Sequence, residues 1–165
     1  MEGLVDLSKD INMIAYLSGP IENAQNDGAD WRVMMTEWLK AELNHKVFDP
    51  VIETKTIIKH QSDKDFRLMK KTNPDEYKMI IRKIIKVDLE AVVQKVDYLI
   101  VNWDKSVFRG GGTHGEVTMA YWFRKPIFLV NKLPIDDISS WIFSCSEEIF
   151  NNFGDLKKRL GELYY

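Results

Sequence analysis

The sequence has a single cysteine, Cys145, with no second cysteine or histidine near it at a metal-ligand spacing. One cysteine cannot form an internal disulfide, so we expect a buried, reduced thiol. The residues present also predict neither a metal site nor a bound cofactor. We therefore expect the fold to be stabilised by an ordinary hydrophobic core.

A secretory signal and a membrane-spanning run are lacking as well. The first residues, MEGLVDLSKD, do not have the basic start followed by an apolar stretch that marks a signal peptide, and no apolar run reaches the length of a transmembrane helix. These absences predict a cytoplasmic protein that does not bind membranes.

There is no excess of charge of one sign. The 23 basic residues are balanced by 25 acidic residues, and the formal net charge is −2. A chain with this balance has no broad positive field to attract a phosphate backbone. Duplex nucleic acid is therefore not an expected partner.

The composition is that of a globular protein, with 45% hydrophobic and 29% charged residues in a chain of 165. We expect a single domain over residues 1–165. Apolar runs that end in turns alternate with segments of helical periodicity, which predicts an α/β fold: a flavodoxin-like or Rossmann-like parallel sheet with helices on both faces. The predicted strands cover residues 12–18, 45–50, 98–103 and 126–131, and the predicted helices cover 30–43, 74–96 and 113–124.

Two segments do not fit this alternation. Residues 53–72 are rich in Lys and Asp and show no long apolar periodicity, so we predict either a lid or an interface insertion there. Residues 135–165 predict a helical tail in two pieces, with the break near Gly154.

Candidate functional residues gather where the predicted strands end. The loop Ser18-Gly19-Pro20 follows the first strand, a glycine-rich stretch follows the third, and Glu116 lies in the expected first turn of the next helix, which Thr113 is expected to cap. Parallel sheets bind ligands beyond the carboxyl ends of their strands. A carboxylate near a helix N-terminus is favoured in the ionised form that a nucleophile needs, although acidic residues also occupy first turns simply because they stabilise helices.

Three stretches carry a resemblance to a known family: YLSGP, VDLEAVVQKVDYLIVNW and GGGTHGEVTMAYWFRKPIFLV. In order and approximate spacing they resemble nucleoside 2-deoxyribosyltransferases over about residues 12–131. The resemblance implies that Glu116 attacks the anomeric carbon of the sugar and expels the base, leaving a glycosyl-enzyme ester that a second base or water resolves. It also implies that Tyr16 holds Glu116 in place and that Asp88 assists base departure. Two successive displacements of this kind retain configuration.

One position departs from the family pattern. Transferases that act on free nucleosides carry an aspartate where this chain has Gly110, and Asp104 is the alternative sugar ligand. Related N-glycosidases of deoxynucleoside 5′-monophosphates have a small neutral residue at this point. Arg109, Gly110, Gly112 and Thr113 therefore predict either a phosphate cradle or a merely flexible loop.

The remaining candidates each have two interpretations. Ser18, Gly19 and Pro20 form a tight loop that can approach a sugar or base closely, or an ordinary turn. Trp103 either stacks on a base or belongs to the core, and His114 either touches substrate or faces solvent.

We predict three possible functions from these residues. The first is transfer or hydrolysis at the N-glycosidic bond of a nucleoside, the second is hydrolysis of a nucleoside 5′-monophosphate, and the third is a catalytically silent nucleotide-binding module. The expected partners are a small-molecule nucleoside or nucleotide and a nucleobase. The resemblance also implies a homo-oligomer.

Overall fold

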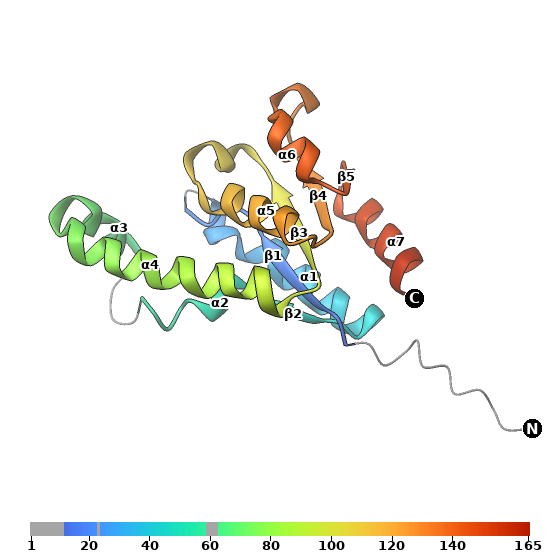
Figure 1. Ribbon diagram of the computed structural model, residues 1–165, viewed down its shortest axis with the longest axis horizontal. Helices are drawn as coiled ribbons and strands as arrows, with labels where there is room; N and C mark the ends of the chain where they lie inside the picture. Colours follow the sequence, from blue (N-terminus) through green and yellow to red (C-terminus); the bar gives the residue numbers. More distant parts are fainter. Residues whose placement is uncertain (1–11, 23, 59–62) are drawn as a thin grey trace, which may run out of the picture.

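The computed structural model describes residues 12–22, 24–58 and 63–165, and within them the strands form one five-stranded, fully parallel sheet (Figure 1). The strand order is β2-β1-β3-β4-β5, the doubly wound flavodoxin-like arrangement. The predicted α/β class is confirmed. The strands are β1 (Ile14–Ser18), β2 (Lys46–Phe48), β3 (Tyr98–Trp103), β4 (Ile127–Asn131) and β5 (Glu148–Phe150).

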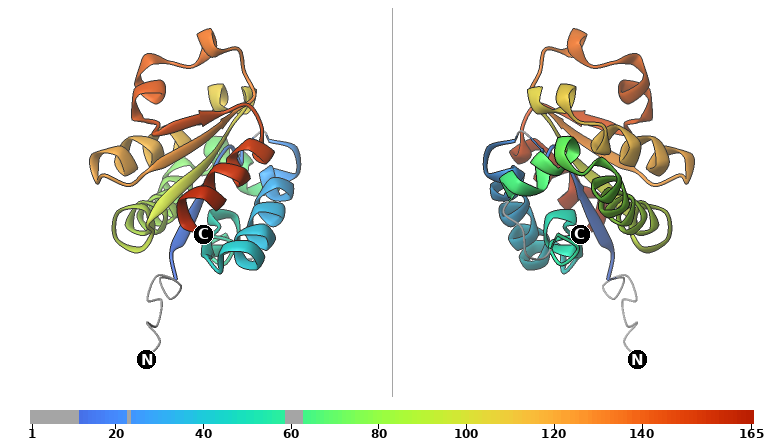
Figure 2. Two further views of the ribbon diagram at one scale, coloured as in Figure 1. Left: turned by 90° about the vertical axis from the view of Figure 1, so that its right-hand side faces the viewer. Right: turned by 90° about the vertical axis from the view of Figure 1, so that its left-hand side faces the viewer.

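Helices cover both faces of the sheet (Figure 2). On one face, α1 (Ala29–Leu43) and α7 (Phe153–Tyr164) bury their leucines against the strands. On the other face lie α4 (Pro74–Glu90) with the π-helical turn Ala91–Lys95 that extends it, α5 (Gly112–Trp122) and α6 (Ser140–Cys145). Every residue of β3 and β4 is buried, which explains their near-continuous apolar sequences.

The start of α4 is confirmed at the predicted position. Asn73 caps the helix by accepting a hydrogen bond from the amide of Glu76, and Pro74 occupies the first turn, where a missing N–H costs nothing. No described helix combines the length and apolar character needed to cross a bilayer.

Within residues 53–72 the structure contains a helix, α3 (Asp63–Thr72). Phe66 and Met69 are buried on it, and the Phe66 ring lies 5.1 Å from that of Tyr77 on α4. Phe66 and Met69 are three residues apart and therefore share one face of α3, a helical spacing that covers only a short stretch of the segment. Residues 59–62 lie outside the described residues, and the lid or interface role stays a prediction.

The prediction that residues 135–165 are helical in two pieces is wrong in one respect, because this tail contributes a fifth strand to the sheet. Residues 148–150 pair in parallel with β4 at the edge of the sheet, and three residues are too few for a periodic pattern. The break between α6 and α7 therefore falls at this strand. Gly154 instead lies in the first turn of α7, which Asn152 caps through the amide of Asp155.

Candidate active site

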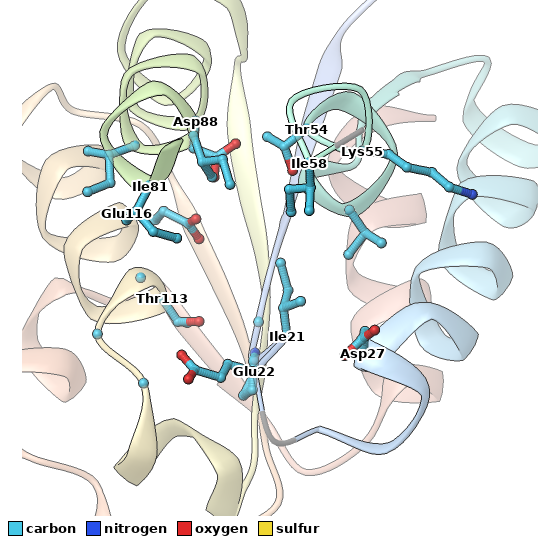
Figure 3. Close-up of a pocket in the computed structure, with 18 of the residues that line it drawn as sticks. Ile21, Glu22, Asp27, Thr54, Lys55, Ile58, Ile81, Asp88, Thr113 and Glu116 are labelled. Atoms are coloured by element: carbon cyan, nitrogen blue, oxygen red, sulfur yellow. The ribbon is translucent and has the colours of Figure 1, made fainter. Parts of the chain in front are cut away.

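A cavity of about 1200 Å³ opens at the carboxyl ends of β1 and β3 (Figure 3). This is the edge at which the sequence predicted a ligand site. Its wall is built from residues 19–22 after β1, α2 (Pro50–Glu53) with the residues that follow it, α3, α4, the glycine-rich loop and the first turns of α5.

Glu116 is fixed by two hydroxyl groups from β1. The Tyr16 hydroxyl donates to Oε1 at 2.9 Å, and the Ser18 hydroxyl donates to Oε2 at 2.5 Å. Tyr16 and Ser18 are fully buried, while Glu116 reaches the cavity wall. Each carboxylate oxygen thus has a hydrogen-bond donor, and side chains of β1 fix the orientation of Glu116.

The helix begins earlier than predicted, which changes what holds Glu116. Gly111 precedes α5 and makes no side-chain cap, so the expected capping role of Thr113 is wrong. Glu116 is the fifth residue of the helix, past the turn in which the helix dipole acts most strongly. Its hydrogen bonds from β1 are therefore its main support.

Burial and hydrogen bonding act on Glu116 in opposite directions. Burial raises the pKa of the Glu116 carboxyl above its ordinary value, although the Ser18 and Tyr16 hydroxyls, followed by the charge of Arg32, act to lower it. Burial also raises the pKa of Tyr16 well above its ordinary value, helped by the charges of Glu116 and Asp88. Tyr16 therefore remains a hydrogen-bond donor throughout the physiological range.

Asp88 is a second carboxyl group at the same cavity. Asp88 and Glu116 project into it from α4 and α5 (Figure 3). Burial, and then the charge of Glu116, raise the pKa of Asp88 to about 8 against the opposing charge of Arg32. Its Oδ1 atom is buried without a hydrogen-bond partner within the described part of the chain. The raised pKa favours the protonated form of Asp88 near neutral pH.

The structure brings several other predicted residues to this cavity. Gly19 and Pro20 line it after β1, and Gly110, Gly112 and Thr113 line it on the α5 side. Ser18 differs from the prediction, since its fully buried hydroxyl binds Glu116 and is not open to a ligand.

Besides Tyr16 and Ser18, which bind Glu116 from β1, four predicted residues lie away from the cavity wall. Trp103 is 2% exposed, belongs to the hydrophobic core cluster and packs edge-on against His114, with ring centroids 4.9 Å apart. Asp104 caps the 3-10 turn Lys105–Arg109 through the amide of Ser106, and its distance to that amide is 2.8 Å. Arg109 is exposed at the end of that turn. None of the four supplies a side chain to the described cavity wall.

The sequence did not single out the apolar wall or Glu22. Ile21 and Ile58 lie opposite the two carboxyl groups, and Glu22 extends from the loop after β1 toward Thr113 (Figure 3). Ile21 and Glu22 could have been predicted as site residues from the sequence, because they directly follow the Gly19-Pro20 turn at the end of a strand. Ile58 belongs to the segment without periodicity and gave no such signal.

The cavity presents carboxyl groups as candidate reactive side chains. In residues 12–22, 24–58 and 63–165, no group of three or more His, Cys, Asp or Glu side chains is placed to hold a metal ion. The chemistry that these residues themselves support is nucleophilic attack by one carboxylate and proton transfer by another.

The fold and cavity define an α/β domain with two unlike carboxyl groups at the carboxyl edge of its sheet. No family model matches the sequence, and no curated protein matches it either. Among solved structures, a 2-deoxyribosyltransferase from Bacillus psychrosaccharolyticus is similar with a TM-score of 0.60 and 19% identity, over 87% of this chain and 90% of that one. A CMP N-glycosidase from Clostridium botulinum is similar with a TM-score of 0.53 and 17% identity, over 92% and 99%. These similarities establish a shared fold.

Proposed function

We propose that this protein cleaves or exchanges the N-glycosidic bond of a nucleoside or nucleotide through a covalent intermediate on Glu116. The observation that carries the proposal is the pair of carboxyl groups at one cavity. Glu116 is held by two hydroxyl donors that favour its ionised form, while the raised pKa of Asp88, about 8, favours its protonated form. An ionised nucleophile beside a protonated acid is the division of roles that glycosidic bond cleavage requires.

In the first step, a carboxylate oxygen of Glu116 attacks the anomeric carbon of the sugar. The bond from that carbon to the base nitrogen breaks, and the base leaves with the electron pair and takes a proton from Asp88. The products are free base, a sugar ester of Glu116 and an ionised Asp88.

In the second step, a water molecule or another base attacks the same carbon and displaces Glu116. Asp88 accepts the proton that the attacking group loses, which restores both carboxyl groups to their starting forms. Water gives hydrolysis and a base gives transfer, and in either case the configuration is retained.

The apolar wall supports a nucleobase as the leaving group. Ile21 and Ile58 lie opposite the carboxyl groups, and Ile81 lines the α4 side (Figure 3). Apolar side chains of this kind suit the flat faces of a base and exclude water from the reacting bond. The names of the two similarly folded proteins, a 2-deoxyribosyltransferase and a CMP N-glycosidase, agree with this chemistry.

The wall beside the glycine-rich loop favours a substrate with an uncharged sugar end. Glu22 extends toward Thr113, whereas Arg109 lies outside the wall (Figure 3). A carboxylate accepts a hydrogen bond from a sugar hydroxyl but repels a phosphate. The second candidate is a 5′-monophosphate N-glycosidase, in which the amides of Gly110 to Gly112 hold the phosphate.

We also expect a homo-oligomer, with the second copy on the outer surface of α5 and α6. Trp122 is 77% exposed and Trp141 is 65% exposed, and the Trp141 indole donates to the Thr118 hydroxyl, one turn before Trp122 on α5. Aromatic side chains are typical of subunit contacts. Sedimentation of the wild type and of Trp122→Lys tests this, and a wild type that is monomeric at micromolar concentration would refute it.

A substrate panel tests the proposed function. Purified protein is incubated with nucleosides and 5′-monophosphates, with and without an acceptor base, and free base and new nucleoside are measured by chromatography. We expect base release that is abolished by Glu116→Gln. Binding without base release by the wild type would favour the silent nucleotide-binding module.

A further inference from the structure

We propose that Arg32 is a positioning residue of this site: its buried guanidinium holds the backbone on both sides of Ser18, so that the hydroxyls of β1 meet Glu116. The catalytic meaning of this inference rests on the proposed function. The positioning itself is a property of the folded chain and is measurable without turnover.

Arg32 projects from α1 and is 0% exposed, which is rare for an arginine unless its donors are satisfied. Its Nε donates to the carbonyl of Leu17 at 3.3 Å, and its Nη2 donates to the carbonyl of Gly19 at 2.8 Å. These two residues flank Ser18. One rigid group therefore holds the Leu17–Ser18 and Gly19–Pro20 peptide units, which lie on either side of the residue whose hydroxyl is 2.5 Å from Glu116.

The same guanidinium ties the end of β1 to the start of α1 and to the end of β2. Its Nη1 donates to the carbonyls of Gly28 at 2.8 Å and Asp27 at 3.4 Å. Its Nε lies 3.6 Å from Oδ1 of Asp49, the buried cap of α2. Arg32 thus joins three segments that meet beneath the cavity.

The charge of Arg32 reaches both carboxyl groups of the site. Within the described part of the chain, it is the cation that lowers the pKa of Glu116 and of Asp88. Asp49 in turn helps to keep Arg32 protonated, because its charge opposes the lowering of the Arg32 pKa by burial. A fixed positive charge in a poorly solvated place stabilises a carboxylate more than it would in water.

The backbone at Gly28 is shaped to admit this side chain. Gly28 has φ of +69°, and a Cβ atom there would lie 2.6 Å from Nη1 of Arg32 and 2.6 Å from the carbonyl oxygen of Pro20. Both contacts are too short to tolerate. Gly28→Ala is therefore a way to displace the guanidinium without removing it.

The test measures the ionisation of Glu116 directly, by ¹³C NMR titration of its side-chain carboxyl carbon, with Glu116→Gln to assign the signal. Arg32→Met should raise the titration midpoint by about one pH unit, a tenfold change in the ionisation constant. Arg32→Lys, which keeps the charge, should restore most of that shift. Its single ammonium cannot serve the same set of carbonyls, so kcat should remain at least about tenfold low while KM changes little.

Lys40→Met, an exposed change on the same helix, is the matched control and should leave both the midpoint and kcat unaltered. Circular dichroism and thermal melts establish that each variant is folded. If Arg32→Met does not fold, Arg32→Lys and Gly28→Ala decide the question, and Gly28→Ala should raise the Glu116 midpoint and lower kcat.

If Arg32→Met and Gly28→Ala fold and lose thermal stability but keep the wild-type Glu116 midpoint, the inference is overturned, because Arg32 would then be only structural. A wild type that releases no base from any substrate would instead refute the proposed function. The titration would still judge the positioning role in that case, so the two failures are distinguishable.

Discussion

Glu116 raises the pKa of Asp88: the two side chains project into one cavity from adjacent helices, and the charge of Glu116 adds to burial in bringing the Asp88 pKa to about 8. Burial raises the pKa of both carboxyl groups, and hydroxyl donors oppose that rise at Glu116. One is supported as an anion by hydroxyl donors, and the other is kept protonated, which is the arrangement expected of a nucleophile and its general acid.

The first prediction is a pH profile. Base release requires ionised Glu116 and protonated Asp88, so kcat/KM should fall at alkaline pH, through a pKa near 8 for Asp88. It should also fall at acidic pH, as Glu116 becomes protonated. In Asp88→Asn, kcat/KM should no longer fall at alkaline pH. Cleavage should slow most for substrates whose base is a poor leaving group. An unchanged alkaline limb in that variant would mean that Asp88 is not the acid.

The second prediction concerns stability. Because folding raises the pKa of Asp88 from 3.8 to about 8, the folded protein favours the protonated form, and Asp88 should cost stability progressively as pH rises from about 4 to 8. Asp88→Asn avoids that cost. Its free energy of unfolding should exceed that of the wild type at pH 9, by an amount on the order of a few kcal/mol, and match it more closely at pH 4. Urea denaturation at both pH values measures the difference.

The third prediction separates the two donors to Glu116. Tyr16→Phe and Ser18→Ala each remove one hydrogen bond that lowers the Glu116 pKa. Each should move the acid limb of the pH profile upward and reduce kcat by about tenfold, the effect of roughly 1.4 kcal/mol. Tyr121→Phe, an exposed change at the other end of α5, serves as the control. If both variants lose affinity for substrate at unchanged kcat, the hydroxyls contact substrate rather than orient Glu116.

The fourth prediction addresses the sugar end of the substrate. Glu22 extends toward Thr113 beside the glycine-rich loop, so its charge should disfavour a 5′-phosphate (Figure 3). Glu22→Gln should improve kcat/KM for monophosphates relative to nucleosides by about tenfold, the scale of one charged contact. Arg109→Ala should leave this ratio unchanged. A large loss of monophosphate cleavage in Arg109→Ala would restore the phosphate interpretation of that arginine.

Much of the fold was predictable because its strands are buried and apolar. Residues 98–103 and 126–131 stand out as predominantly hydrophobic runs, and the Asn73-Pro74 pair marks a helix start. The strand at 148–150 was not predictable, since three half-buried residues are defined by pairing with β4 rather than by their own pattern.

The site was predictable only in part. Residue types and the family resemblance drew attention to Tyr16, Asp88 and Glu116, but a fully buried strand does not reveal which of its side chains face inward. Trp103 therefore remained ambiguous until the structure placed it in the core. Arg32 was missed because an arginine on an amphipathic helix is normally a solvated residue, and its burial depends on carbonyls from distant segments.

The covalent intermediate is the central claim, and trapping it is the most direct test. A 2-fluoro-2-deoxyribosyl nucleoside with a good leaving base should form the sugar ester at a useful rate and hydrolyse slowly, because the fluorine destabilises both oxocarbenium-like transition states. Intact-protein mass spectrometry should show the wild type gaining the mass of one fluorosugar, and peptide analysis should place it on Glu116. Glu116→Gln should gain nothing. A wild type that releases base without any adduct on Glu116, or a Glu116→Gln variant that releases base at a near-normal rate, would contradict the proposed mechanism.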